Sequence, residues 1–277
     1  MATKTGTNSH GHYLWTFFVF AVRATRRSNR SVEELERLLG FLMIPFVYLL
    51  RFRGILRTPI GKIRIVNQDS ILVLTHLLFK TGFCYLYKLD TILPKKHFLP
   101  TIIDVGANIG DFTLAMSRDC GRIVALEPGF QNFKTLVSNV KVNLLSNVIP
   151  MNVAAHDSSE ELTLIGENPD LRVDRLGDGP KVKGISLDEV VRQQDIKRVD
   201  LLKIDVQGHE MTVLRGMSGI LQRHSAGLVI VEVHLERGTS LQEVISTMNF
   251  HGYRFLGSDD YTPRNPQLYF NSNYDVR

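Results

Sequence analysis

The feature that most constrains the fold of this chain is a short apolar strand that runs directly into a glycine-containing loop and a helix. Residues Thr101–Val105 read TIIDV, a run with β-branched residues that is typical of a buried strand. Gly106 and Gly110 follow, and Asp111 begins a stretch with apolar residues at helical spacing. Glycines allow a backbone to approach a ligand closely, and a helix N-terminus offers free N–H groups. The unit therefore predicts a ligand-binding α/β domain.

The spacing within the loop indicates which ligand it suits. A dinucleotide-binding loop reads G-x-G-x-x-G and holds a pyrophosphate at the helix N-terminus. Here Asp104, Gly106 and Gly110 give D-x-G-x-x-x-G instead. A carboxylate at the strand end would repel a pyrophosphate but attract a cationic amino group. S-adenosylmethionine carries such a group and no phosphate, so we favour it over NAD as the cofactor.

A second strand points to the same class of ligand. Residues Arg122–Leu126 form another apolar run, which ends in Glu127 and Pro128. An acidic residue about 20 positions beyond the first strand is placed to hydrogen-bond ribose hydroxyl groups. Ribose binding alone does not separate the adenosine ligands, whereas its combination with Asp104 does.

Further residues complete the predicted cofactor site. Asn108 in the loop and Asn152 near the end of the third strand are candidates for orienting the cofactor. Ala154 lies in the third predicted strand, just before 155–157, where the adenine edge is expected. The full predicted set is Asp104, Gly106, Asn108, Gly110, Glu127, Pro128, Asn152 and Ala154.

Strands and helices alternate along the rest of the chain, which is typical of a parallel sheet with crossover helices. Apolar runs predict strands at 148–154, 199–206, 227–233, 253–256 and 267–270, and helices at 130–145, 210–217 and 241–250. A stretch rich in Gly and Asp at 161–178 resembles a hairpin. We therefore expect an α/β fold.

Three residues after the fourth strand are candidates for catalysis. Asp205 ends that strand, and His209 and Glu210 lie in and just after the following turn, at the sheet edge where α/β proteins bind ligands. Chemistry on a bound ligand needs positioning, and proton transfer needs a base within reach. Plainer roles also exist: Asp205 as a loop cap, His209 as a surface residue, and Glu210 as an acid stabilised by a helix dipole.

Two residues of the fifth strand share a face with one another. Glu232 and His234 alternate along it, so they point to the same side. Asp205, Glu232 and His234 are candidates for holding a divalent cation, but no ligand spacing requires one and we assign no metal. Lys203 stands within an apolar strand and is expected to be structural, either a snorkelling or a paired lysine.

The front of the chain differs from the rest in charge. Residues 1–100 carry 15 Lys and Arg against 5 Asp and Glu, whereas residues 101–277 carry 18 against 23. An apolar run at 13–22 precedes four arginines, but as a helix it spans only about 15 Å, half of a membrane core. A second apolar stretch at 38–50 is interrupted by Pro45 and followed by arginines.

Several roles stay open for this basic, apolar segment. It suits a helix on an anionic membrane surface, where each basic residue adds about 1 kcal/mol, and it equally suits a helix packed on the following domain. The charge order disfavours a secretory signal. Nucleic-acid binding is disfavoured because the basic residues adjoin apolar runs. We expect a cytoplasmic protein with peripheral membrane contact; organelle targeting by residues 1–30 is the alternative.

Seven short segments, taken in order, carry a resemblance to a known family. They are Asp104–Gly110 (DVGANIG), Ala125–Pro128 (ALEP), Ser186–Asp188 (SLD), Asp200–Asp205 (DLLKID), Gly208–Glu210 (GHE), Leu214–Gly216 (LRG) and Glu232–His234 (EVH). The chain resembles the FkbM family of S-adenosylmethionine-dependent methyltransferases over roughly 58–270. The resemblance implies a class I fold: a seven-stranded, mostly parallel sheet with helices on both faces, here preceded by an N-terminal helical and β extension. It also implies O-methylation of a sugar or another small-molecule acceptor.

The resemblance suggests three regions in the chain, and the chain differs from the family's usual pattern at two places. We expect a basic apolar segment at 1–57, a β-rich and helical lead-in at 58–100 and the cofactor-binding domain at 101–277. Gln207 stands where the family usually has Glu, and 82–85 lacks the family's acid. Gln207 and the basic front of the chain leave a second hypothesis open, a catalytically degenerate domain that acts as a membrane-associated binding scaffold.

Overall fold

The computed structural model describes residues 54–58, 61–65, 89–92, 98–166, 171–259 and 265–272. The apolar runs at 13–22 and 38–50, the targeting segment 1–30 and the departure at 82–85 lie outside these ranges, so the expectations for them stay predictions. Within the described ranges, no helix combines the length and the apolar character that spanning a lipid bilayer requires.

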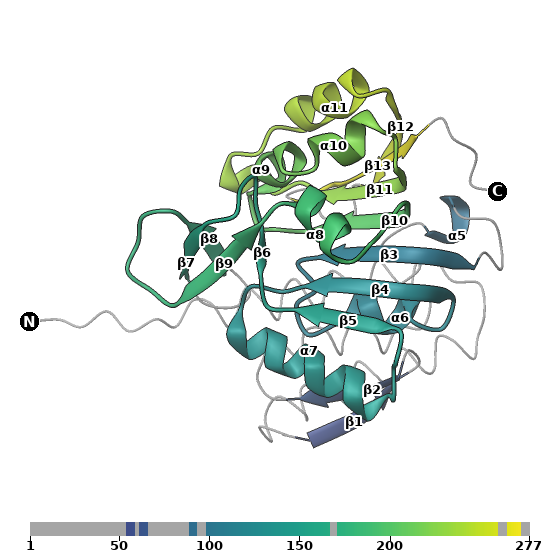
Figure 1. The fold of residues 1–277 in the computed structure, drawn as a ribbon, viewed down its shortest axis with the longest axis vertical. Coiled ribbons are helices and arrows are strands. Elements are labelled where there is room, and N and C mark those ends of the chain that lie inside the picture. The colour runs from purple at the N-terminus through teal and green to yellow at the C-terminus, as the bar shows by residue number, and fades with distance from the viewer. Residues whose placement is uncertain are drawn as a thin grey trace, which may run out of the picture.

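A seven-stranded sheet forms the centre of the described structure (Figure 1). Its strands are β3 (Leu99–Val105), β4 (Cys120–Leu126), β5 (Val148–Met151), β10 (Val199–Ile204), β11 (Ala226–Glu232), β12 (Tyr253–Asp259) and β13 (Gln267–Ser272). They lie in the order β12-β13-β11-β10-β3-β4-β5. β13 is antiparallel to both of its neighbours, and the other pairs are parallel. The predicted mostly parallel sheet is confirmed.

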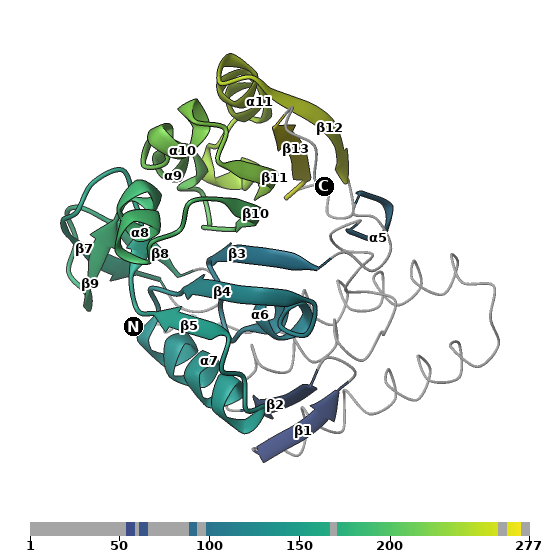
Figure 2. The ribbon, with the colours of Figure 1, turned by 45° about the vertical axis from the view of Figure 1, so that its right-hand side comes forward.

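Helices cover both faces because both faces of the parallel strands are apolar (Figure 2). The helices are α6 (Asp111–Met116), α7 (Phe130–Val142), α8 (Leu187–Gln193), α9 (Glu210–Arg215), α10 (Ser218–Gln222) and α11 (Leu241–Phe250). On one face, Ile103 and Leu202 belong to a buried cluster with residues of α8 to α11. On the other face, Ile102 and Leu201 cluster with residues of α6 and α7. Neighbouring strand residues thus point into separate halves of the core.

The chain reverses its direction across the sheet at β3. From β3 it continues to β4 and β5 on one side and later returns to β10 and β11 on the other. Ligands of open α/β sheets bind beyond the carboxyl ends of the strands at such a point. The loops meet closely there, since a Cβ atom at Gly106 (φ +76°) would lie 1.8 Å from the carbonyl oxygen of Asp205. Glycine is the residue that this approach permits.

A small second sheet connects β5 to α8. Its strands are β6 (Ala154–Ala155), β7 (Glu161–Ile165), β8 (Arg172–Asp174) and β9 (Lys181–Ile185), in the order β6-β9-β7-β8. β7 and β8 pair antiparallel, which confirms the predicted hairpin. The single strand predicted at 148–154 is instead divided into β5 and β6. β9, α8 and α10 were not expected. Ser186 caps the N-terminus of α8, and its hydroxyl accepts the N–H of Glu189 at 3.2 Å.

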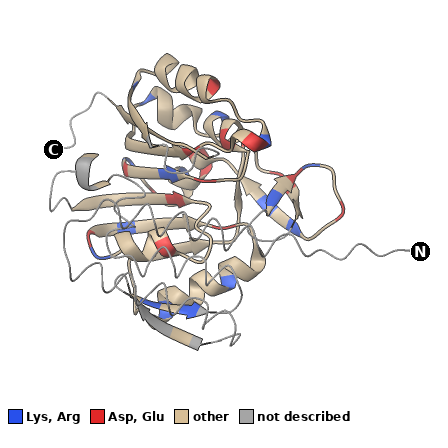
Figure 3. Ribbon diagram, turned by 180° about the vertical axis from the view of Figure 1, so that it is seen from behind, with Lys and Arg blue, Asp and Glu red and all other residues tan. Residues whose placement is uncertain are grey.

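The lead-in contributes a hairpin that packs on α7. It consists of β1 (Gly54–Thr58) and β2 (Gly61–Ile65), and a short helix α5 (Leu89–Ile92) follows. The N–H groups of Lys62 and Arg64 each donate at 2.7 Å to an asparagine of this region, Asn143 and Asn139 respectively. Figure 3 shows basic residues of β2 and α7 gathered at this end of the molecule. The boundary expected at residue 57 falls inside β1.

Candidate functional site

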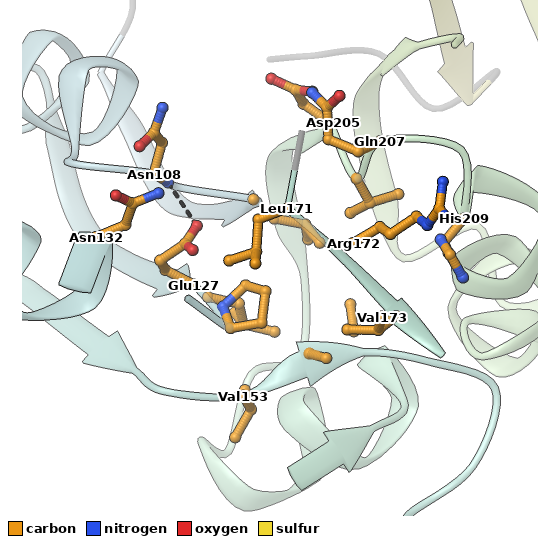
Figure 4. Close-up of a pocket in the computed structure, with 17 residues that line it drawn as sticks. Asn108, Glu127, Asn132, Val153, Leu171, Arg172, Val173, Asp205, Gln207 and His209 are labelled. Carbon is orange, nitrogen blue, oxygen red and sulfur yellow. Dashed lines mark hydrogen bonds between the residues drawn. The ribbon is translucent and has the colours of Figure 1, made fainter. Parts of the chain in front are cut away.

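A pocket opens beyond the carboxyl ends of β3, β4 and β10 (Figure 4). Its empty space measures about 740 Å³, part of which is open solvent. Asn108, Glu127 and Asn132 lie on one side, and Asp205, Gln207 and His209 lie on the other. Apolar side chains, among them those of Val153, Leu171 and Val173, line the space between them. The arrangement suits a ligand with both polar groups and a flat apolar ring.

The predicted cofactor residues divide into those that line the pocket and those that support it. Gly106, Asn108, Glu127, Pro128 and Ala154 line it. Asp104, Gly110 and Asn152 lie behind the lining. The supporting residues fix the loop and the strand end, as their contacts show.

The glycine loop reaches its shape through left-handed backbone angles. Gly106, Asn108 and Gly110 have φ values of +76°, +50° and +93°. A Cβ atom at Gly110 would lie 2.6 Å from Leu136 Cδ1, so the loop lies close against α7. This course aims the N–H of Asn108 at the end of β4.

Glu127 is the polar centre of the first side. Its Oε2 accepts the N–H of Asn108 at 2.8 Å, and its Oε1 accepts the N–H of Gly129 at 2.8 Å. Burial raises the pKa of the carboxyl to about 7. The Asn152 amide donates to the carbonyl oxygens of Glu127 and Pro128 at 2.8 and 3.0 Å. Asn152 therefore fixes the backbone at this strand end, which differs from the direct cofactor contact expected for it.

Asp104 is fully buried beneath the loop. Thr113 Oγ1 donates to its Oδ2 at 2.6 Å, and Lys203 Nζ donates to its Oδ1 at 3.3 Å. The same ammonium donates to the carbonyl oxygen of Gly106 at 3.1 Å. Lys203 is thus buried and paired, which is one of the two structural roles expected for it. The geometry does not support direct contact between Asp104 and a ligand's amino group, because the side chain is 0% exposed and does not line the pocket.

Asp205 and His209 present polar atoms on the second side of the pocket. Within the described residues, Asp205 Oδ1 and His209 Nδ1 are buried and have no hydrogen-bond partner. Burial lowers the pKa of His209 below its ordinary value of 6.5, so the imidazole is neutral at pH 7 and keeps a lone pair. Both predicted catalytic residues are therefore placed to meet a ligand.

Glu210, in contrast, is fully buried and acts through its neighbours. Its Oε1 lies 2.7 Å from His234 Nδ1 and accepts the N–H of Gly208 at 2.9 Å. Thr239 Oγ1 donates to its Oε2 at 2.5 Å. Burial would raise the pKa of Glu210, but the hydrogen bonds from His234 and Thr239 outweigh it and lower the pKa. An ionised carboxylate only accepts, so His234 Nδ1 donates and Nε2 faces away. Glu210 does not line the pocket, so the structure places it behind His234 rather than against a ligand.

Asp205, Glu232 and His234 come together at the edge of this second side. His234 Nε2 lies 3.7 Å from Asp205 Oδ1 and 4.0 Å from Glu232 Oε1. The expectation that Glu232 and His234 face the same side is confirmed.

Several residues of the site were missed by sequence reasoning. Asn132 of α7 and the segment Leu171–Val173 line the pocket, and Thr239 supports Glu210. The hairpin containing Leu171–Val173 was recognised, but nothing in its composition indicates that it folds over the sheet edge.

Comparison with known proteins agrees with this geometry. The family model described as the methyltransferase FkbM domain matches residues 104–255, more than half of the chain. The hexuronic acid methyltransferase AglP of Haloferax volcanii is 34% identical over 135 residues, which cover 47% of this chain and 54% of AglP. Methyltransferase 1 of Beauveria bassiana is 30% identical over 143 residues, which cover 42% of this chain and 57% of that protein. The matches thus span little more than half the length of these curated relatives.

A solved structure shows the same fold. The FkbM methyltransferase of Methylobacillus flagellatus KT superimposes with a TM-score of 0.51 at 17% identity, covering 83% of this chain and 59% of that one. The sheet order, the glycine loop and the family match agree with one another. This chain therefore belongs to the FkbM family of S-adenosylmethionine-dependent methyltransferases.

Proposed function

We propose that this protein methylates a hydroxyl group of a sugar or another small-molecule acceptor. The observation that carries the proposal is the two-sided pocket, in which Glu127 and Asn108 face Asp205 and His209. Family membership supports methyl transfer. The similarity to a hexuronic acid methyltransferase supports a sugar hydroxyl as the acceptor.

The residues of the pocket fit S-adenosylmethionine. Each Glu127 oxygen accepts one backbone N–H, and an ionised carboxylate has about four acceptor positions, so it can still accept from ribose hydroxyls. Val153 and Leu171 provide apolar surface for a purine ring. Asn108 Oδ1 is buried and lacks a hydrogen-bond partner in the described ranges, which leaves it available to a ligand donor.

The residues of this chain have two tasks in the reaction. When bound, S-adenosylmethionine supplies a methyl group activated by its sulfonium, so the sulfur–carbon bond breaks as the acceptor oxygen–carbon bond forms. Asp205 orients the acceptor hydroxyl by accepting its hydrogen bond. The neutral His209 takes the hydroxyl proton, since its lowered pKa leaves a lone pair at pH 7.

Calorimetry tests the cofactor half of the proposal. The full chain should bind S-adenosylmethionine in the micromolar range and should not bind NAD. Glu127→Ala should weaken that binding at least tenfold, which is about 1.4 kcal/mol, while the exposed Glu161→Ala control binds normally. Circular dichroism verifies that both variants fold. Equal affinity in the two variants would contradict the assigned role of Glu127.

A labelled-methyl assay tests the acceptor. With isotopically labelled S-adenosylmethionine and glycosides that contain hexuronic acids, NMR should show a new O-methyl group. Transfer to other hydroxyl compounds alone would replace the sugar assignment and keep the reaction. A chain that binds no S-adenosylmethionine would favour the degenerate scaffold.

We infer a separate role for the basic front of the chain, contact with an anionic membrane surface. Its support is the excess of Lys and Arg in residues 1–100 beside apolar runs. The full chain should sediment with vesicles that contain phosphatidylserine, and high salt should release it. Equal sedimentation with uncharged vesicles would contradict the inference.

A further inference from the structure

We propose that Asp205, Glu232 and His234 hold a divalent metal cation at the acceptor side of the pocket. Its assigned role, binding the acceptor hydroxyl, rests on the function proposed above, whereas the binding of the cation does not.

The spacing of the three side chains suits one cation. His234 Nε2 lies 3.7 Å from Asp205 Oδ1 and 4.0 Å from Glu232 Oε1. Protein nitrogen and oxygen ligands bind metals such as Mg²⁺ and Zn²⁺ at about 2.1 Å, so two atoms on the same ion lie up to about 4.2 Å apart. All three ligand atoms lie within 4.8 Å of one another, a spread that small side-chain rotations close.

Each of the three side chains is held from behind by another residue. Glu210 accepts from His234 Nδ1 at 2.7 Å, which turns Nε2 toward the two carboxylates. Gln267 Nε2 donates to Glu232 Oε2 at 3.0 Å, which leaves Oε1 toward His234. Lys203 Nζ lies 3.5 Å from Asp205 Oδ2, which leaves Oδ1 toward the same point. Supporting contacts of this kind, above all a carboxylate on the far nitrogen of a histidine, orient metal ligands in proteins.

The atoms that face the common point lack partners. The His234 side chain is 3% exposed. Within the described residues, neither His234 Nε2 nor Asp205 Oδ1 has a hydrogen bond. A buried polar atom left unpaired costs about 1–3 kcal/mol. A direct hydrogen bond between them would require about 3 Å, and the observed 3.7 Å is too long. The gap is explained by a ligand that both atoms share.

A second cluster of similar composition differs in that arginines pair with its carboxylates. Asp157 and Glu160 lie near His156 Nδ1, at 3.0 and 3.3 Å. Arg175 lies 2.9 and 3.0 Å from these two carboxylates, and Arg215 lies 3.4 Å from Asp157. Arginines therefore already supply the positive charge there.

The donor set and its position define the class of ion and its use. Two carboxylates and one imidazole suit Mn²⁺, Zn²⁺ or Mg²⁺. Asp205 also lines the pocket, so the remaining coordination positions are open to an acceptor. A hydroxyl on a cation loses its proton more readily. In this arrangement His209, which also lines the pocket, takes the proton, the oxygen forms its bond to the methyl carbon, and the sulfur–carbon electrons stay on sulfur.

Manganese binding tests the inference without any turnover. Mn²⁺ is titrated into the full chain, with no cofactor or acceptor present, and followed by electron paramagnetic resonance and calorimetry. We expect one tightly bound ion per chain. Glu232→Gln, which keeps the side-chain shape, should weaken binding at least tenfold. Glu210→Gln should weaken it by about 10- to 100-fold through His234. Glu160→Gln in the arginine-paired cluster is the matched control and should bind normally.

Two results would overturn the inference: no stoichiometric Mn²⁺ binding by the folded wild type, or equal binding by Glu232→Gln and Glu160→Gln. Thermal unfolding verifies that each variant is folded. S-adenosylmethionine titrations of the same samples separate the two proposals. Cofactor binding without a Mn²⁺ site contradicts only the metal inference. A Mn²⁺ site that Glu232→Gln removes, in a chain that binds no cofactor, supports the metal inference and contradicts the proposed methyl transfer.

Discussion

The two sides of the pocket differ in how completely their ionisable side chains are hydrogen-bonded. On the β3–β4 side, Asp104 and Glu127 are almost wholly buried, and every carboxylate oxygen has a protein donor. On the β10–β11 side, Asp205 and His234 each keep a buried atom without a partner in the described ranges. On the first side the paired carboxylates give a fixed frame, and Asn108 Oδ1 is the buried atom left for the cofactor. On the second side the unpaired atoms of the charged groups themselves are available to a ligand. Lys203, 3.3 Å from Asp104 and 3.5 Å from Asp205, joins the two sides.

The largest effect is expected where the two sides touch. Gly106→Ala places a Cβ atom 1.8 Å from the carbonyl oxygen of Asp205, so the loops must separate. We expect the free energy of unfolding to fall by about 5 kcal/mol or more, measured by urea denaturation. Gly238→Ala is the control, because Gly238 also has a positive φ but a Cβ atom there meets nothing within 4 Å. It should lose only about 1–2 kcal/mol. Equal losses would mean that the two sides do not depend on this contact.

The second-largest loss of stability is expected on removal of the Lys203 ammonium, which lies near both Asp104 and Asp205. Lys203→Met leaves Asp104 buried without its cation, and breaking such a pair costs about 3–5 kcal/mol. Adding Asp104→Asn to Lys203→Met should recover part of this loss, whereas adding Asp205→Asn should recover less, because Asp205 is 23% exposed and Asp104 is 0% exposed. Denaturation of the single and double variants measures both interactions. Stronger recovery with Asp205→Asn would reverse our view of which side Lys203 stabilises.

A smaller effect depends on pH and isolates the first side. Burial raises the pKa of Glu127 from 4.5 to about 7, so the folded state binds this proton more tightly than the unfolded chain. The stability contribution is complete below pH 4.5 and is lost as pH rises through 7. Relative to Glu127→Gln, the wild type should lose up to about 3 kcal/mol between these values. Chemical denaturation across this range measures the difference, and a constant difference would show that Glu127 titrates normally.

The smallest loss of stability is expected for a change at Glu210, and its consequences should be confined to the second side of the pocket. Glu210→Gln removes the ionised acceptor of His234 and Thr239 but keeps the side-chain shape, so unfolding should cost about 1–2 kcal/mol less. S-adenosylmethionine affinity should change less than threefold, because Glu210 does not line the pocket. Calorimetry measures this. A tenfold loss of cofactor affinity would show that the two sides are not separate.

The sequence was informative where local pattern determines structure. Apolar runs predicted β3, β4, β10 and β11 to within about two residues, and the residues that end them line or support the pocket as expected. Partners that lie far apart in the sequence were not predictable. The residues near Asp104 give no sign that Lys203, 99 positions away, lies beside it. The two residues meet because β3 and β10 pair in parallel and place Lys203 opposite Asp104. The position of Leu171 over the pocket likewise depends on packing between segments that periodicity does not describe.

Asp205 links binding on one side of the pocket to binding on the other. Its carboxylate lines the pocket and also faces His234, so an occupant on either side changes the environment of the same group. Any free-energy coupling that arises through it is reciprocal: whatever factor a cation adds to cofactor affinity, the cofactor adds to cation affinity. Through this one carboxylate, the affinity of each half of the site depends on whether the other half is occupied.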